Sequence, residues 1–182
     1  MIIVDREFFE KNQVATIDVA EQKCFTKECS DEFSVSDGES IVKELNEQAK
    51  LGTLRIASKG IPGTKDFEFL DGLHVQMYNI VIYRGAELDI HPYGVCYHDY
   101  AKRISTGVIE VLHGTDKELV IVGGLATEFC MLETIKELAV AGFMVVLNLG
   151  ACRGFDPSDA IDEMKAMTNV FVIDTYRELI VN

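Results

Sequence analysis

Short runs of apolar, often β-branched residues alternate with longer amphipathic segments along this chain. The runs cover residues 14–19, 54–58, 79–83, 119–123, 143–148 and 170–173, and several are apolar on both faces. Strands of this kind are typical of a parallel sheet covered by helices on both sides. The amphipathic segments predict helices over residues 39–50, 100–112, 128–141 and 157–167, with a short one after Asp174.

Strands that alternate with helices form right-handed βαβ units. We therefore expect an α/β fold, a three-layer α/β/α sandwich with a central, mainly parallel sheet of about six strands. The 182 residues are enough for one complete core and show no linker, so we expect a single domain over residues 1–182.

The composition narrows the range of partners and compartments. A net charge of −13 argues against binding nucleic acid or an anionic membrane, because phosphate repels such a surface. No apolar run approaches the ~20 residues of a membrane span, and the opening residues do not resemble a signal peptide. We therefore expect a cytoplasmic protein. Its five cysteines, irregularly spaced, do not form a disulfide framework.

Three reactive side chains follow predicted strands. Asp18 lies at the end of the first strand, Arg84 ends the third, and Cys130 lies in the first helical turn after the fourth. Ligands of open α/β sheets bind beyond the carboxyl ends of the strands. A helix dipole and a nearby cation such as Arg84 favour the thiolate form of Cys130. A carboxylate such as Asp18 can take the thiol proton, and the turn before the helix offers backbone N–H groups that could bind an oxyanion.

Simpler interpretations stay open for each residue. Cys130 could be a packed core cysteine, Asp18 a turn former and Arg84 a surface residue.

The four histidines, His74, His91, His98 and His113, form no regular metal-binding spacing, although a polar loop contains both His91 and His98. We predict no metal site and no cofactor.

The stretch from Val122 to Cys130, Val-Gly-Gly-Leu-Ala-Thr-Glu-Phe-Cys, resembles the nucleophile motif of the nicotinamidase and isochorismatase-like cysteine hydrolases, and most closely that of the nicotinamidase branch. Residues 16–19, 33–40 and 151–155 are similar to further segments of that family. This resemblance implies an isochorismatase-like, Rossmann-like sheet.

The resemblance also implies roles for residues. Cys130 is expected to be the nucleophile and Asp18 the general base, with Arg84 as the third catalytic residue. The peptide bond between Leu125 and Ala126 is expected to be cis, and the N–H groups of Ala126 and Cys130 to form an oxyanion hole.

Aromatic residues are expected to contact the substrate, and we assign Phe25 and Tyr93 to this role.

The chain departs from the family pattern in several places. Arg84 stands before Gly85 where the family has lysine, and residues 57–62 lack the family's Asp-x-His metal ligands. The chain has no tryptophan, and the spacing from Asp18 to Phe25 is longer than usual.

We therefore predict a metal-independent cysteine amidohydrolase that cleaves the non-peptide C–N bond of a small amide through a Cys130 thioester. Two alternatives remain: a nicotinamidase proper, and a catalytically degenerate relative that binds a small ligand or partner without turnover. The expected partners are a small-molecule amide and further copies of the chain in a dimer or tetramer.

Overall fold

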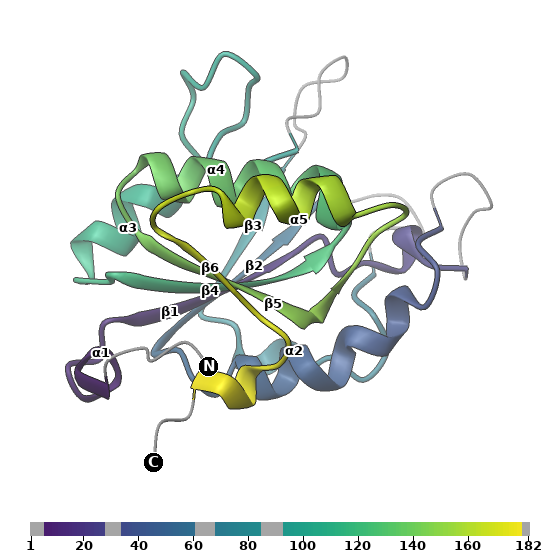
Figure 1. Cartoon of the computed structure of the whole chain (residues 1–182), viewed down its shortest axis with the longest axis horizontal. Coiled ribbons are helices and arrows are strands. Elements are labelled where there is room, and N and C mark those ends of the chain that lie inside the picture. Colours follow the sequence, from purple (N-terminus) through teal and green to yellow (C-terminus); the bar gives the residue numbers. More distant parts are fainter. Residues whose placement is uncertain (1–5, 28–33, 61–67, 85–92, 180–182) are drawn as a thin grey trace.

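The computed structural model of the chain describes residues 6–27, 34–60, 68–84 and 93–179. Six strands of these residues form one parallel sheet in the order β3-β2-β1-β4-β5-β6 (Figure 1). Their bounds are β1 Val14–Val19, β2 Leu54–Lys59, β3 Ile80–Tyr83, β4 Leu119–Leu125, β5 Met144–Arg153 and β6 Val170–Ile173. The predicted parallel α/β sheet is confirmed, and each strand begins within one residue of its predicted start.

Helices cover both faces of this sheet and make the three layers (Figure 1). One face carries α3 Val108–Gly114, α4 Leu132–Val140 and α5 Ser158–Lys165, and the other carries α2 Val42–Gln48. A short α1 spans Arg6–Glu10, and 3-10 turns span Lys23–Phe25, Gly38–Ile41, Val75–Met77 and Tyr176–Leu179. None of the helices in the described ranges has the length and apolar character needed to cross a membrane.

The helix predicted over residues 100–112 begins later than expected, at Val108. The Asp99 carboxylate accepts hydrogen bonds from the backbone N–H groups of Arg103 (2.8 Å) and Ile104 (2.9 Å). Such local side-chain bonds offer the backbone an alternative to the helix. The prediction was therefore wrong for the first two turns of this segment.

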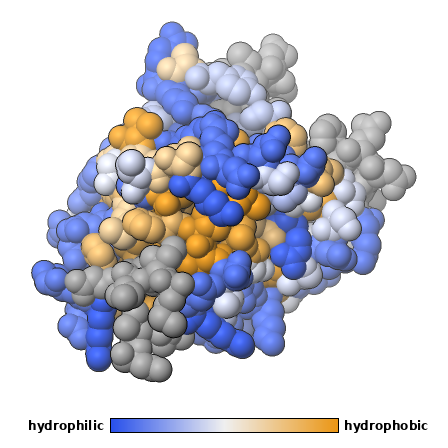
Figure 2. Space-filling model, in the orientation of Figure 1, coloured by the Kyte–Doolittle hydropathy of each residue, from blue (hydrophilic) through white to orange (hydrophobic). Residues whose placement is uncertain are grey.

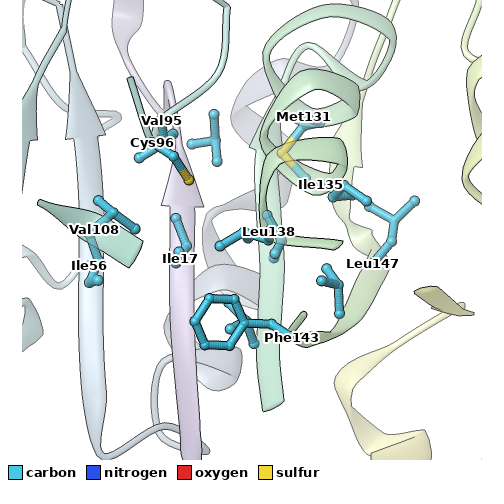
Figure 3. Packing of buried hydrophobic residues seen from close by; sticks show 14 of the residues in the cluster. Ile17, Ile56, Val95, Cys96, Val108, Met131, Ile135, Leu138, Phe143 and Leu147 are labelled. Carbon is cyan, nitrogen blue, oxygen red and sulfur yellow. The ribbon is translucent and has the colours of Figure 1, made fainter. Parts of the chain in front are cut away.

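Apolar side chains from the sheet and from α3 and α4 form the largest core cluster (Figure 3). Ile17 on β1, Val108 on α3 and Leu138 on α4 are fully buried and face one another across this layer. Burying a side chain of this size contributes about 1.5–3 kcal/mol. Packing of this cluster therefore fixes the layer of α3 and α4 over the central strands.

The space-filling view shows an apolar area near the middle of one face of the molecule, bordered by hydrophilic residues (Figure 2). Figure 1 places β6 in front on the same side. This strand is the last in the sheet order and reads Val-Phe-Val-Ile, with Phe171 and Val172 half-buried. The sheet therefore ends on this side in an apolar edge strand.

The neighbouring strands β1 and β4 lie at the topological switch point of the sheet. The chain leaves β1 towards α2 on one face and leaves β4 towards α4 on the other (Figure 1). Open α/β sheets bind their ligands in the crevice at such a point. Here the strands approach so closely that a Cβ atom on Gly124 would lie 2.0 Å from the carbonyl oxygen of Val19.

We predict that Gly124→Ala destabilises the protein by more than about 3 kcal/mol, because the added Cβ meets backbone that cannot move aside and the residue has a φ of +138°. Gly107→Ala is the matched control. It also has a positive φ, +87°, but a Cβ there meets nothing within 4 Å, so only the backbone strain of about 1–2 kcal/mol is expected. Urea unfolding measures both, and equal losses would contradict the prediction.

Candidate active site

Asp18 lies near the carboxyl end of β1, paired with Ala57 of β2 and Gly123 of β4. Its side chain is fully buried. Gln48 Nε2 donates a hydrogen bond to Oδ1 (3.0 Å), and the Tyr78 hydroxyl donates one to Oδ2 (2.6 Å). Burial raises the pKa of Asp18 to about 7, while the two hydrogen bonds act in the lowering direction. Near neutral pH this carboxylate can therefore accept or release a proton.

Two further contacts hold the donors of Asp18 in place. Asn148 of β5 donates through Nδ2 to Gln48 Oε1 (3.0 Å), which directs the Gln48 amide nitrogen towards Asp18. The Tyr78 ring stacks on Phe69 with 6.0 Å between ring centres. Burial raises the pKa of Tyr78, and the nearby carboxylates of Asp18 and Glu21 raise it further, so the hydroxyl remains a donor.

Cys130 lies in the turn that follows β4. The peptide bond between Leu125 and Ala126 is cis, as the family resemblance implies. The next residues, Thr127–Met131, form a π-helical turn rather than the α-helical turn expected, because the carbonyl of Ala126 accepts bonds from Phe129 and Met131 (both 3.2 Å). The predicted oxyanion-hole residues, Ala126 and Cys130, thus belong to one turn directly after β4.

The described cysteines are free thiols in different settings. Burial raises the pKa of Cys152 to about 12. Burial, helped by the Glu137 carboxylate, raises that of Cys96. Both therefore stay protonated at neutral pH. Cys130 is buried but keeps 8% of its surface exposed, and Cys24 is half-buried.

Arg84 follows β3 directly and is buried, with 8% of its surface exposed. Its Nη1 donates to the carbonyl oxygens of Tyr93 and Gly94 (3.5 Å to Gly94). Within the part of the chain described, these carbonyls, and not Asp18 or Cys130, receive the hydrogen bonds of the guanidinium. The strand ends that carry Asp18 and Arg84 lie ~10 Å apart, because β2 lies between β1 and β3.

Both aromatic residues predicted to contact substrate pack against residues of the Cys130 turn or the core clusters to which it belongs. The Tyr93 ring is 47% exposed and packs against Phe129, the neighbour of Cys130, with ring centres 5.7 Å apart. Phe25 is half-buried and packs against the clusters that contain Ala126 and Cys130. Arg84 fixes Tyr93 through its carbonyl group.

Several residues around Asp18 were not predicted. Gln48 lies in a helix and Tyr78 follows a 3-10 turn, and no spacing in the sequence links either of them to Asp18. Glu21 and Lys59 are buried at the same edge of the sheet, where the charge of Lys59 acts on Glu21. Lys59 directly follows the strand predicted over residues 54–58 and is the last residue of β2. A charged residue at the end of a strand was the one sequence feature that could have indicated its place at this edge of the sheet.

The residues at the end of β2 do not fit a metal ion. Ser58 Oγ accepts a hydrogen bond from the backbone N–H of Ala20 (3.2 Å), and the Lys59 ammonium lies 3.8 Å from the centre of the Phe69 ring. An ammonium group cannot ligate a cation. The described ranges contain no group of three or more histidine, cysteine or acidic residues suited to a metal, and His91 lies outside those ranges.

No protein-family model and no curated protein matches the chain by sequence. Solved structures do match. PnC1 from L. infantum, in complex with nicotinate, superposes with a TM-score of 0.85 at 20% identity over 99% of this chain and 98% of its own. The pyrazinamidase of Pyrococcus horikoshii, in complex with zinc, superposes with a TM-score of 0.75 at 23% identity over 88% of this chain and 98% of its own. An isochorismatase-like hydrolase from Alkaliphilus metalliredigens superposes with a TM-score of 0.72 at 13% identity over 92% of this chain and 96% of its own.

We predict that Cys130 is alkylated before the other cysteines when the protein meets limiting iodoacetamide at neutral pH. Cys96 and Cys152 should react last, because their buried thiols stay protonated. Mass spectrometry of the peptides after brief treatment measures the order, with unfolded protein as the control in which all cysteines react. Labelling first at Cys152 would contradict the assignment of Cys130.

Proposed function

We propose that this chain, which has the fold of nicotinamidases and isochorismatase-like hydrolases, is a cysteine amidohydrolase that cleaves the C–N bond of a small amide. The observation that carries the proposal is Asp18: a fully buried carboxylate with a pKa of about 7, at the carboxyl end of the strand that adjoins β4 and its Cys130 turn. General bases are poised in this way near the working pH.

The proposed reaction begins when Asp18 takes the proton of the Cys130 thiol. The thiolate attacks the amide carbonyl carbon, and the N–H groups of Ala126 and Cys130 receive the negative oxygen. The C–N bond then breaks, and the proton held by Asp18 leaves with the amine as ammonia. Asp18 next takes a proton from water, whose oxygen attacks the thioester carbon. The C–S bond breaks, Asp18 returns its proton to the Cys130 sulfur, and the acid is released.

Asp18 has the capacity for this role in spite of its two hydrogen bonds. A carboxylate offers about four lone-pair sites, so the bonds from Gln48 and Tyr78 leave each oxygen able to accept another proton. They hold the carboxylate in one orientation. Arg84 is proposed to contribute by fixing Tyr93 beside Phe129, and by its positive charge.

A second candidate function is binding of a small ligand without turnover. It is favoured by one observation: Arg84 directs its Nη1 hydrogen bonds to the backbone of Tyr93 and Gly94 rather than to the proposed acid–base group.

We further propose that copies of the chain associate as a dimer or tetramer, for which the apolar edge strand β6 offers a surface.

We predict ammonia release from at least one compound in a screen of small primary amides at neutral pH. Cys130→Ala should abolish it, because no nucleophile remains. Asp18→Asn should lower it by about 10²–10⁴-fold, the usual contribution of a general base. If the unmodified protein binds an amide without releasing ammonia, the second function is favoured. Ammonia release that survives in Cys130→Ala would contradict the mechanism.

The pH dependence gives a separate test. We predict that kcat/KM rises with pH with a midpoint near 7, because Asp18 must lose its proton to act as a base. Tyr78→Phe removes a hydrogen bond that stabilises the ionised carboxylate, so the pKa of Asp18 and the midpoint should rise, by about one pH unit.

Tyr100→Phe is the control for this measurement, since Tyr100 is 56% exposed and its substitution should leave the midpoint unchanged. A midpoint near 4 in the unmodified protein, or the same midpoint with and without the Tyr78 hydroxyl, would show that another group controls the activity.

A further inference from the structure

The carboxyl group of Glu21 is fully buried, yet apart from its own backbone N–H no group of the described residues forms a hydrogen bond with either of its oxygens. Buried polar groups in folded proteins are nearly always hydrogen-bonded, because an unpaired one loses its hydration without compensation. A buried carboxyl group with no partner in the rest of the described chain is therefore a candidate contact for a bound ligand.

The backbone around Glu21 is held firmly. Ala20, with φ of +53°, turns the chain out of β1, and its N–H donates to the carbonyl of Ser58 (3.3 Å). The carbonyl of Glu21 accepts a hydrogen bond from the N–H of Leu70 (3.1 Å). Contacts on both sides thus hold the Glu21 backbone over the end of β2, which limits the movement of its side chain towards water.

Charged groups at the ends of three neighbouring strands act on Glu21. Its pKa is raised well above the usual range by burial and by Asp18 of β1, and the positive charges of Arg84 after β3 and Lys59 of β2 act in the opposite direction. Glu21 therefore belongs to the polar group at the carboxyl ends of these strands, on the side where the crevice is expected.

The same polar group contains an unpaired donor. Arg84 Nε is buried and, within the described ranges, has no acceptor, although Nη1 of the same guanidinium is bound to the Tyr93 carbonyl. A buried carboxyl group that holds its proton offers one O–H donor and one carbonyl acceptor, and together with the N–H of Arg84 it is the complement of a primary carboxamide, which offers N–H groups and a carbonyl oxygen.

We propose that Glu21 and Arg84 Nε bind a second primary carboxamide group of the ligand, distinct from the amide that is cleaved, so that small diamides are the preferred substrates. This inference rests on the proposed function only for the identity of the cleaved bond. A site built to pair an N–H group discriminates strongly against an analogue that lacks it, because the acceptor is then left unpaired.

Calorimetric titration of the Cys130→Ala protein tests this site without turnover. The probes are malonamide, succinamide and glutaramide, each compared with the compound in which one amide is replaced by a methyl ester. At least one diamide should bind about tenfold or more tightly than its ester partner, since the ester has no N–H to donate to Glu21.

Two variants in the same background locate the effect. Glu21→Leu removes both polar atoms and should abolish the preference for the diamide, whereas Glu21→Gln, which keeps one donor and one acceptor in a side chain of the same size, should retain it. Glu68→Leu is the matched control. It makes the same substitution in a side chain that is 72% exposed, so the preference should remain.

The proposal is overturned if no diamide binds measurably, if diamide and ester bind equally, or if the preference persists in Glu21→Leu while thermal unfolding shows that this variant is folded. These outcomes differ from a failure of the proposed function, which is measured by ammonia release. A protein that releases ammonia without preferring diamides would keep the amidase function and lose this site.

Discussion

The close approach of β1 and β4 is the contact on which the arrangement of the candidate site depends. The chain can form it only because residue 124 has no side chain: a Cβ there would overlap the carbonyl oxygen of Val19. Val19 follows Asp18, and Gly124 lies six residues before Cys130. One backbone contact therefore brings the strand that carries the carboxylate next to the turn that carries the thiol, although more than a hundred residues separate them in the chain.

The polar groups behind this contact have an energetic cost that the apolar core must offset. Asp18 is ionisable and fully buried, and its hydrogen bonds continue through Gln48 to Asn148 on β5. Such a network orients the carboxylate, and burial keeps its pKa near neutrality. The buried carboxyl group of Glu21, on which the charge of Asp18 acts, lies in the same region. Local rules of polar satisfaction are usually broken where a protein binds or reacts, so this concentration at one edge of the sheet supports a functional site there.

Much of the fold could be predicted because the apolar runs are strongly β-branched and the sheet is buried on both faces. The ends of the elements were less accessible. Nothing in the periodicity of residues 100–107 shows that the Asp99 carboxylate binds the backbone and delays the helix to Val108. At the site, Asp18 and Cys130 could be found because they follow strands. Tyr78 could not, because its contact with Asp18 joins residues 60 positions apart that share no pattern.

The position of the positive charges has a consequence for how the proposed reaction handles protons. The family resemblance places a lysine at the end of β3, where this chain has Arg84, and one of the lysines of this chain, Lys59, lies one strand nearer to β1. A guanidinium keeps its proton at any physiological pH, so Arg84 can orient and stabilise but cannot carry a proton between groups. The Lys59 ammonium faces the Phe69 ring, and that ring stacks on Tyr78, which donates to Asp18. Both cations therefore act on the site through the groups they contact and through their charge, and the proposed reaction assigns each proton transfer to Asp18.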